Sequence, residues 1–313
     1  MTTAVNPSSR LTSQLVNWVL SIKPVFHLAK HQARRMMKKR AASIGVDWIQ
    51  EVALLCSREG TEEFSSEWIA ELAQIQNNQL QYPDYYLRPF HAYEQGNLSW
   101  EAAMEVEVAA HAVHARLWPD APGQGSTRLR QNYITALNSQ LSSAPQAIVD
   151  LGCSVGMTTF ALQEAYPHAQ ITGVDLSPYF LAIARYRSQQ RQANVNWIHA
   201  AAESTGLPTA SFDLVSVFLV FHELPQSAAI AVLHEARRLL RPEGYLAITD
   251  VNPHSPTHAK MPPYILTLLK STEPYIDEYF ALDLEKAIVE AGFTAPTLTS
   301  ISPPHRTLIA RAV

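Results

Sequence analysis

Residues 148–156 read Ile-Val-Asp-Leu-Gly-Cys-Ser-Val-Gly, the most informative stretch of the sequence for the fold class. An apolar segment ends in an acidic residue, Asp150, and runs into a loop of small residues that leads into a helix predicted to begin near Met157. Small residues in such a loop let backbone N–H groups approach a ligand closely. The chain has only 11 glycines in 313 residues, about half of what average usage of ~7% would supply. The two glycines of this loop, Gly152 and Gly156, therefore indicate a backbone requirement.

Downstream of the loop, short apolar runs alternate with helical patterns, which predicts a parallel sheet with crossover helices. Ser177 followed by Pro178 is typical of a helix start, since serine caps the first N–H groups and proline fits the first helical position. The run 213–221 is nearly all apolar and is expected to be buried on both faces. The last two apolar runs predict a terminal hairpin. The expected strands are 147–150, 170–175, 195–200, 213–221, 245–251, 295–301 and 306–312.

The chain before about residue 145 is helical throughout by the spacing of its apolar residues. We therefore expect a helical N-terminal domain over 1–130, which caps or docks onto a second domain over 131–313. Residues 252–282 contain five prolines and are expected to form a lid insertion after the fifth strand. The expected N-terminal helices are Leu11–Ile22, Val25–Ile44, Trp48–Ser57, Glu67–Gln76, Trp100–Trp118 and Arg128–Leu141.

The composition excludes several classes of protein. The formal net charge is −4, from 24 Lys and Arg against 28 Asp and Glu, which argues against a dominant surface for binding phosphate backbones. Cys56 and Cys153 are far apart and make no disulfide framework, as expected of a protein in the reducing cytoplasm. No apolar run approaches the length of a membrane-spanning helix, and the first residues lack the plan of a signal peptide.

Two kinds of nucleotide ligand use a strand, loop and helix of this type. The dinucleotide fingerprint needs glycines where this chain has Ser154 and Met157, so two of its three glycines are missing. The alternative is an acidic residue, a run of small-x-small-x-Gly, and a second acidic residue at the end of the next strand. Asp150 and Asp175 supply the two acidic residues. A carboxylate at the second position can accept both hydroxyls of an adenosine ribose.

With these residues in place, the sequence resembles the class I S-adenosylmethionine-dependent methyltransferases over roughly residues 130–313. The resemblance rests on DLGCSVG at 150–156, GVDLS at 173–177, AAESTGLPTASFDLV at 201–215 and RRLLRPEGYLAITD at 237–250. It looks closest to the small-molecule branch that includes the quinone C-methyltransferases. It implies a Rossmann-like, seven-stranded, mostly parallel sheet with a terminal antiparallel hairpin. It also implies S-adenosyl-L-methionine as cofactor and methyl transfer to an oxygen or carbon of a small, fairly apolar or aromatic acceptor.

The resemblance further implies which residues hold the cofactor. The loop 150–156 would cradle its methionine part, Asp175 its ribose, and Leu176 its adenine. Ala201 stands where the family often has an acidic residue for the adenine amine, so that contact falls to the backbone of Ala202 and to Glu203. The expected cofactor residues are Asp150, Gly152, Ser154, Gly156, Asp175, Leu176, Ala202, Glu203 and Phe218.

We expect methyl transfer to take place near His222 and Glu223, which follow the fourth strand. They would lie at the carboxyl edge of the sheet, where ligands of open parallel sheets bind. A histidine beside a carboxylate suits a base or a pair that orients the acceptor. Alternatively, His222 only caps the strand and helps to close the pocket. The segment FHEL at 221–224 lacks the Asn/Asp-Pro-Pro-aromatic motif of relatives that methylate DNA bases or glutamine amides. A nucleic-acid substrate is therefore not expected, nor is a metal.

The acceptor pocket is less well defined by the sequence. The segment 79–100 is dense in aromatic residues and forms either a seam that docks the helical domain or a cap over the acceptor. Candidate acceptor contacts are Tyr86, His91, Tyr93 and, from the lid, His254.

Two other functions stay open at this point. Residues 11–40 join an apolar part to a basic one, which suits either a helix with a solvated face or peripheral contact with an anionic membrane. The chain would then be a membrane-surface quinone methyltransferase. Alternatively, it would be a non-catalytic cofactor-binding module whose helical half recruits a partner. The sequence does not predict an oligomeric state.

Overall fold

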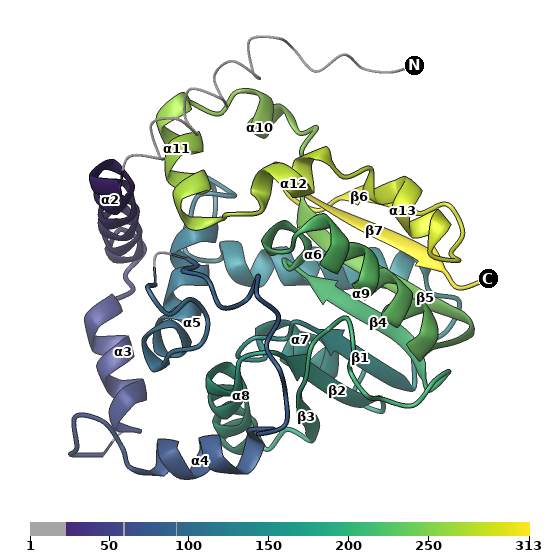
Figure 1. Ribbon diagram of the computed structural model, residues 1–313, viewed down its shortest axis with the longest axis horizontal. Helices are drawn as coiled ribbons and strands as arrows, with labels where there is room; N and C mark the ends of the chain where they lie inside the picture. Colours follow the sequence, from purple (N-terminus) through teal and green to yellow (C-terminus); the bar gives the residue numbers. More distant parts are fainter. Residues whose placement is uncertain (1–22, 59, 92) are drawn as a thin grey trace.

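A computed structural model describes residues 23–58, 60–91 and 93–313 (Figure 1). The expected helix Leu11–Ile22 lies outside the described residues. The sheet has the strand order β3-β2-β1-β4-β5-β7-β6. All neighbouring pairs are parallel except β5 with β7 and β6 with β7. This confirms the predicted seven-stranded, mostly parallel sheet with a terminal antiparallel hairpin. The strands are β1 (Ala147–Leu151), β2 (Gln170–Asp175), β3 (Val195–His199), β4 (Phe212–Phe218), β5 (Leu240–Val251), β6 (Thr297–Ser300) and β7 (His305–Arg311).

Two strand boundaries differ from the sequence prediction by three residues or more. Strand β4 ends at Phe218 rather than at 221, because Leu219 takes a positive φ of 61° that turns the chain out of the sheet. Residues Phe221–Glu223 then form a short 3-10 turn, η1. Strand β5 begins at Leu240 rather than at 245, and its pairing with β4 shifts register between Phe212 and Leu214.

Strand residues alternate between two packed layers, as the period-2 geometry of strands requires. Val149 and Val215 lie in the core under α9 (Gln226–Leu239) and α13 (Leu284–Glu290). Ile148 and Leu214 lie in the opposite core under α6 (Gly125–Gln140) and α7 (Met157–Ala165). The sheet is therefore covered on both faces.

Helix α8 (Pro178–Arg191) begins as the sequence predicts. The Ser177 hydroxyl accepts a hydrogen bond from the Phe180 N–H at 3.3 Å and donates one to the Asn97 carbonyl at 2.7 Å. Phe180 and Ile183 of α8 pack in one cluster with Trp68 from the N-terminal helices. The helical N-terminal part is thus joined to the sheet through α8.

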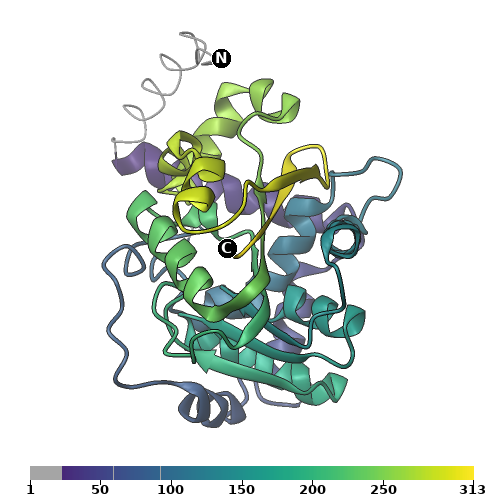
Figure 2. The ribbon, with the colours of Figure 1, turned by 90° about the vertical axis from the view of Figure 1, so that its right-hand side faces the viewer.

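At the carboxyl ends of the parallel strands, one of the N-terminal helices meets the lid (Figures 1 and 2). The N-terminal helices are α2 (Lys23–Ala42), α3 (Trp48–Ser57), α4 (Glu67–Ile75) and α5 (Trp100–His114). The lid holds α10 (Pro256–Ala259), α11 (Pro263–Thr272) and α12 (Ile276–Ala281). Helix α2 packs against both α5 and α11. Helix α6, which covers the sheet, spans the expected domain boundary at 130. Among the described residues, no helix has the length and apolar character needed to cross a membrane.

Candidate functional site

A cavity of about 530 Å³ lies over the carboxyl ends of the central strands and continues between the N-terminal helices and the lid. It collects most of the predicted site residues. Gly156 and His254 are the two that do not line it: Gly156 packs beneath the loop, and His254 is exposed on the lid. The predicted residues that line the cavity are Asp150, Gly152, Ser154, Asp175, Leu176, Ala202, Glu203, Phe218, His222, Glu223, Tyr86, His91 and Tyr93.

The two loop glycines have different reasons to be glycine. Gly152 has a φ of +70°, and a Cβ there would lie 2.5 Å from a methyl carbon of Val220. Gly156 has a φ of +84°, and its Cβ would lie 2.7 Å from the Trp197 ring. The absence of a side chain at 152 thus shapes the cavity wall, whereas at 156 it lets the loop pack on the sheet.

Ser154 stands between these glycines in the left-handed region, with a φ of 51°. Its backbone N–H donates to Asp175 Oδ2 at 2.7 Å. Its hydroxyl oxygen is buried without a hydrogen-bond partner, although the residue lines the cavity. A polar atom kept in this state is suited to contact a bound molecule.

Ser154→Gly is expected to raise the free energy of unfolding by about 1 kcal/mol, because glycine removes the left-handed strain and the buried unpaired hydroxyl. Urea denaturation of the ligand-free protein measures this change. Ala210→Gly is the matched control, since exposed Ala210 also has a positive φ, 52°, but has no hydroxyl to remove. A destabilised Ser154→Gly protein would show that the hydroxyl stabilises the ligand-free loop.

Asp150 is buried at the end of β1. Its carboxylate accepts hydrogen bonds from the hydroxyls of Thr159 at 2.6 Å and Ser216 at 2.9 Å. Burial raises the pKa of Asp150 to about 6, against the opposing effects of these bonds and of the charge on Arg130. Asp150 therefore fixes the loop and places negative charge beneath it.

Arg130, on α6, is a site residue that the sequence did not reveal. Its guanidinium lines the cavity, donates to the Thr158 hydroxyl at 3.1 Å, and lies 5.2 Å from the centroid of the Phe218 ring. Burial lowers the pKa of Arg130 to about 10, so it remains a cation at neutral pH. A buried arginine facing a ligand cavity suits a carboxylate.

Asp175, at the end of β2, is also buried. Oδ1 accepts from the Ser177 N–H and Oδ2 from the Ser154 N–H, both at 2.7 Å. Burial raises the pKa of Asp175 to about 7, although these two bonds act in the opposite direction. The two N–H groups hold the carboxylate in a fixed orientation at the edge of the cavity.

His222 pairs with Asp250 rather than with its sequence neighbour Glu223. The ring Nδ1 lies 2.8 Å from Asp250 Oδ1, and the His222 backbone N–H donates to Oδ2 at 3.2 Å. Burial alone would lower the pKa of His222, but the charge and hydrogen bond of Asp250 outweigh it and raise the pKa to about 9. Because Nδ1 faces Asp250, Nε2 is the ring nitrogen left for a ligand.

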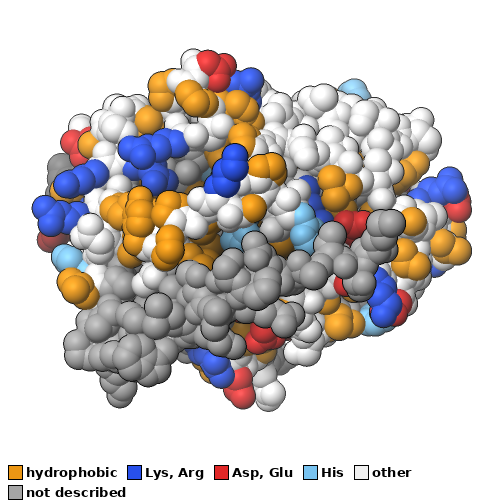
Figure 3. Space-filling model, turned by 90° about the horizontal axis from the view of Figure 1, so that it is seen from above, with side chains coloured by type: hydrophobic (Ala, Val, Ile, Leu, Met, Phe, Trp, Pro, Cys, Tyr) orange, Lys and Arg blue, Asp and Glu red, His pale blue; other side chains and the backbone are white. Residues whose placement is uncertain are grey.

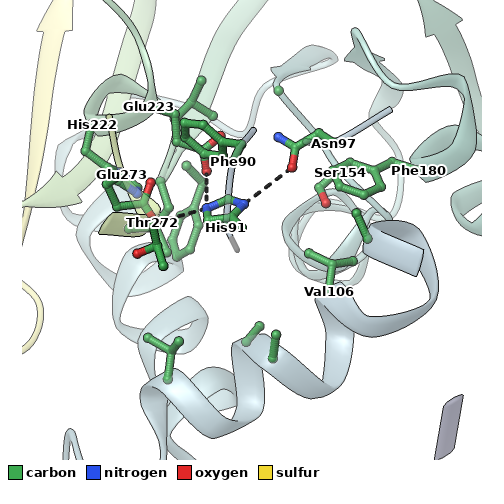
Figure 4. Close-up of a pocket in the computed structure, with 18 of the residues that line it drawn as sticks. Phe90, His91, Asn97, Val106, Ser154, Phe180, His222, Glu223, Thr272 and Glu273 are labelled. Carbon is green, nitrogen blue, oxygen red and sulfur yellow. Dashed lines mark hydrogen bonds and ion pairs between the residues drawn. The ribbon is translucent and has the colours of Figure 1, made fainter. Parts of the chain in front are cut away.

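Glu223 belongs to a second cluster, centred on His91 (Figure 4). His91 Nε2 lies 3.3 Å from Glu223 Oε1 and 3.2 Å from Glu273 Oε1, while Nδ1 lies 3.4 Å from Asn97 Oδ1. Burial would lower the pKa of His91, but the two carboxylates raise it well above its usual value. The cluster ties the aromatic segment of the N-terminal part to the lid.

The tyrosines of the aromatic segment also differ in the partners of their hydroxyl groups. The Tyr85 hydroxyl donates to Glu203 Oε1 at 2.7 Å, which leaves Glu203 Oε2 buried and unpartnered. Tyr86 lines the cavity, and its pKa is raised first by burial and then by the charges of Asp175 and Glu223. Tyr93 lines the cavity with its ring, but its hydroxyl donates to Glu105 at 2.8 Å. Tyr86 therefore lines the cavity within the electrostatic influence of both Asp175 and Glu223.

Two further histidines line the cavity without having been predicted. The rings of His114 and His305 are 5.8 Å apart, and His305 Nδ1 lies 2.7 Å from the Ser302 hydroxyl. Burial lowers the pKa of both, to about 4 for His305, so both are neutral at pH 7. In the described part of the chain, no three His, Cys, Asp or Glu side chains are grouped so as to hold a metal ion.

Comparisons with known proteins agree with this geometry. Residues 148–244 match the family model described as a methyltransferase domain. A demethylmenaquinone methyltransferase of Thermus thermophilus is 31% identical over 118 residues, which cover 38% of this chain and 53% of that protein. A trans-aconitate 2-methyltransferase of Azoarcus sp. is 38% identical over 115 residues, which cover 36% of this chain and 43% of that protein.

A solved structure covers more of the chain. The structure, from Nostoc punctiforme and provisionally described as an O-methyltransferase, has a TM-score of 0.54 at 18% identity. The alignment covers 82% of this chain and 69% of that chain, and at this identity it shows a shared fold. The chain spans about half the length of the first curated relatives that it matches.

Proposed function

We propose that this chain, which carries a class I S-adenosylmethionine-dependent methyltransferase domain, methylates an oxygen or carbon of a small, fairly apolar or aromatic acceptor. The observation that carries the proposal is the His222–Asp250 pair, whose histidine lines the same cavity as Ser154 and Asp175. One end of the cavity has the residues for the methyl donor, and the adjoining wall has a group that can take a proton from the acceptor.

The residues present fit the methyl donor. The buried, unpartnered oxygens of Ser154 and Glu203 both belong to cavity-lining residues, and Gly152 lines the same cavity. When bound, S-adenosylmethionine supplies a methyl group on a positively charged sulfur, and transfer leaves the neutral thioether S-adenosylhomocysteine. Asp175 would accept the ribose hydroxyls, Leu176, Ala202 and Glu203 would border the adenine, and Arg130 would bind the carboxylate of the methionine part.

His222 acts on the acceptor. Its Nε2 takes the proton from the acceptor hydroxyl, so that the O–H bond breaks, an N–H bond forms, and the electron pair stays on the oxygen. Asp250 stabilises the imidazolium through Nδ1. A histidine with a pKa of about 9 is well matched to a phenol, whose pKa is about 10. For a carbon acceptor, loss of the same proton makes the neighbouring ring carbon nucleophilic.

The pH dependence of kcat/KM follows from the pKa of His222. We expect kcat/KM to rise with pH and level off above about 9, because the free enzyme must hold His222 neutral. In Asp250→Asn the charge that raises this pKa is gone, while burial still lowers it. The inflection should then move to a lower pH, although Glu273 and Glu223 still raise the pKa of His222. The plateau should also be lower, because the imidazolium loses its partner. An inflection near 9 in both proteins would assign it to the acceptor instead.

The assay for the proposal is release of S-adenosylhomocysteine from S-adenosylmethionine in the presence of hydroxyaromatic acceptors. Turnover that depends on the acceptor is the expected result. Micromolar binding of S-adenosylhomocysteine without turnover of any phenol, enol or ring-hydroxylated quinol would instead favour the non-catalytic module. No feature of the described residues favours that module.

Peripheral membrane contact would require the basic side chains of residues 11–40 to face an anionic surface. The face in Figure 3 shows hydrophobic side chains among Lys and Arg side chains. Two of the basic residues of α2, however, are engaged within the protein. Arg34 lies 2.7 Å from both Glu101 and Glu105, and the Lys38 amino group lies 5.9 Å from the centroid of the Trp48 ring. These contacts support a role in docking α2 onto its neighbours.

A further inference from the structure

We infer that the acceptor carries an aliphatic arm, and that this arm lies in the part of the cavity enclosed by α2, α5 and α11. The inference rests on the proposed function, because the arm belongs to the same molecule that is methylated. We name this part the helical chamber. Its apolar lining consists of Ala33, Met36 and Met37 from α2, Val106, Ala109, Ala110 and Val113 from α5, and Ile265, Leu268 and Leu269 from α11.

Each of the three helices turns one face to the helical chamber. On every helix the lining residues recur at spacings of three and four, which places them on a single stripe. On α5 this stripe runs from Val106, seen in Figure 4, to Val113. Such apolar stripes normally pack against one another and leave no space between the helices. Here they border a shared cavity.

The side chains of the stripes explain why the helical chamber stays open. Ala109 and Ala110 are too small to fill the space between the helices, and Met36 and Met37 opposite them are flexible. These residues, with Ile265 and Leu268, are only half-buried, although helices surround them. Apolar surface left uncovered inside a protein favours an apolar occupant, since water finds few polar partners there.

The charged groups that line this part are Arg34 and Arg40. Arg34 is bound to Glu101 and Glu105, so its charge is already balanced. The pKa of Arg40 is lowered, first by burial and then by Arg116. The apolar residues of the three stripes outnumber these two cations in the lining, and a hydrocarbon chain would cover those apolar residues.

The helical chamber is continuous with the reacting end of the cavity. His222, Glu223 and Glu273 belong to the same lining as the three apolar stripes. One molecule can thus present a hydroxyl to His222 and extend an aliphatic arm between the helices. This continuity selects the acceptor itself, rather than a separate lipid, as the occupant.

Titration with 4-alkylphenols of increasing chain length tests the inference. Calorimetry is done with the full chain saturated with S-adenosylhomocysteine, using 4-methyl-, 4-butyl- and 4-octylphenol below their aggregation concentrations. The dissociation constant is expected to fall about three- to fourfold for each methylene until the helical chamber is full. A dissociation constant that does not change with chain length would overturn the inference.

Two variants that fill the helical chamber from opposite walls test whether the dependence on chain length arises there. Ala109→Phe on α5 and Ile265→Trp on α11 should each abolish the dependence on chain length while 4-methylphenol still binds. Ala42→Phe is the matched control, because Ala42 is exposed on α2 and does not line the cavity; it should keep the wild-type dependence. Calorimetry with S-adenosylhomocysteine shows whether each variant is folded.

The outcomes separate this inference from the proposed function. If the wild-type protein does not bind S-adenosylhomocysteine, the proposed methyltransferase function is contradicted as well. Normal S-adenosylhomocysteine binding with no chain-length dependence would contradict the aliphatic arm alone. A steep dependence that survives in both filling variants would place the alkyl chain outside the helical chamber and would also overturn the inference.

Discussion

Asp175→Asn is expected to weaken binding of S-adenosylhomocysteine about 100-fold at neutral pH or above. The carboxylate is held by the Ser154 and Ser177 N–H groups and is proposed to accept the ribose hydroxyls. Hydrogen bonds to a charged group contribute about 1.5–3 kcal/mol each, so loss of the charge weakens several at once. The amide also turns an NH2 group toward one of the two N–H donors. Isothermal calorimetry measures the change.

Asp213→Asn is the matched control for this prediction. Asp213 likewise accepts from two backbone N–H groups, those of Gln146 at 2.8 Å and Ala147 at 2.9 Å, but it does not line the cavity. The control should alter stability and leave the dissociation constant within twofold of wild type. Equal weakening by both substitutions would mean that Asp175 supports the fold and does not bind the ribose.

His222→Gln is expected to lower kcat by about 10²- to 10⁴-fold, the range typical for loss of a general base. Glutamine keeps polar atoms near Asp250 but cannot take a proton from the acceptor. The dissociation constant for S-adenosylhomocysteine should stay unchanged, because Ser154, Asp175 and Arg130, which are proposed to hold the cofactor, lie on other elements than His222. Formation of S-adenosylhomocysteine with a 4-alkylphenol that the wild-type protein methylates provides the rate.

His234→Gln serves as the control, since His234 is exposed on α9 and lies outside the cavity. Its kcat should equal that of the wild type. A His222→Gln protein with wild-type kcat would show that His222 only closes the pocket, which is the alternative that the sequence left open.

The fold could be predicted because local signals and the wider pattern agreed. Ser177 caps α8 as its sequence indicates, and the alternation of strands and helices after residue 147 produced the predicted parallel sheet. The family model that matches residues 148–244 confirms the predicted methyltransferase domain. The end of β4 was placed three residues late because the apolar run continues past Leu219, whose positive φ is invisible in the sequence.

The site was predictable where strand ends bring residues together. Asp150 and Asp175 end the paired strands β1 and β2, and His222 follows β4, so parallel pairing places all three at one edge. Asp250, near the end of β5, lies at this edge too, and the pairing of β4 with β5 was a usable signal for it. By contrast, the position of Arg130 depends on how a helix packs over the sheet, which no local pattern encodes.

The partner of Glu223 could not be predicted for the same reason, because it depends on packing between distant segments. Its adjacency to His222 suggested a catalytic pair, but the 3-10 turn Phe221–Glu223 points the two side chains to different partners. Glu223 meets His91, which comes from a segment far away in sequence. Side chains that converge from the aromatic segment, the strand end and the lid could be found only from the structure.

A crystal structure of the full chain with S-adenosylhomocysteine bound would show where the ribose and the sulfur lie. We expect both ribose hydroxyls within hydrogen-bond distance of the Asp175 carboxylate, and the sulfur facing the space between Tyr86 and His222. A ribose bound away from Asp175, or a sulfur turned away from His222, would contradict this expectation.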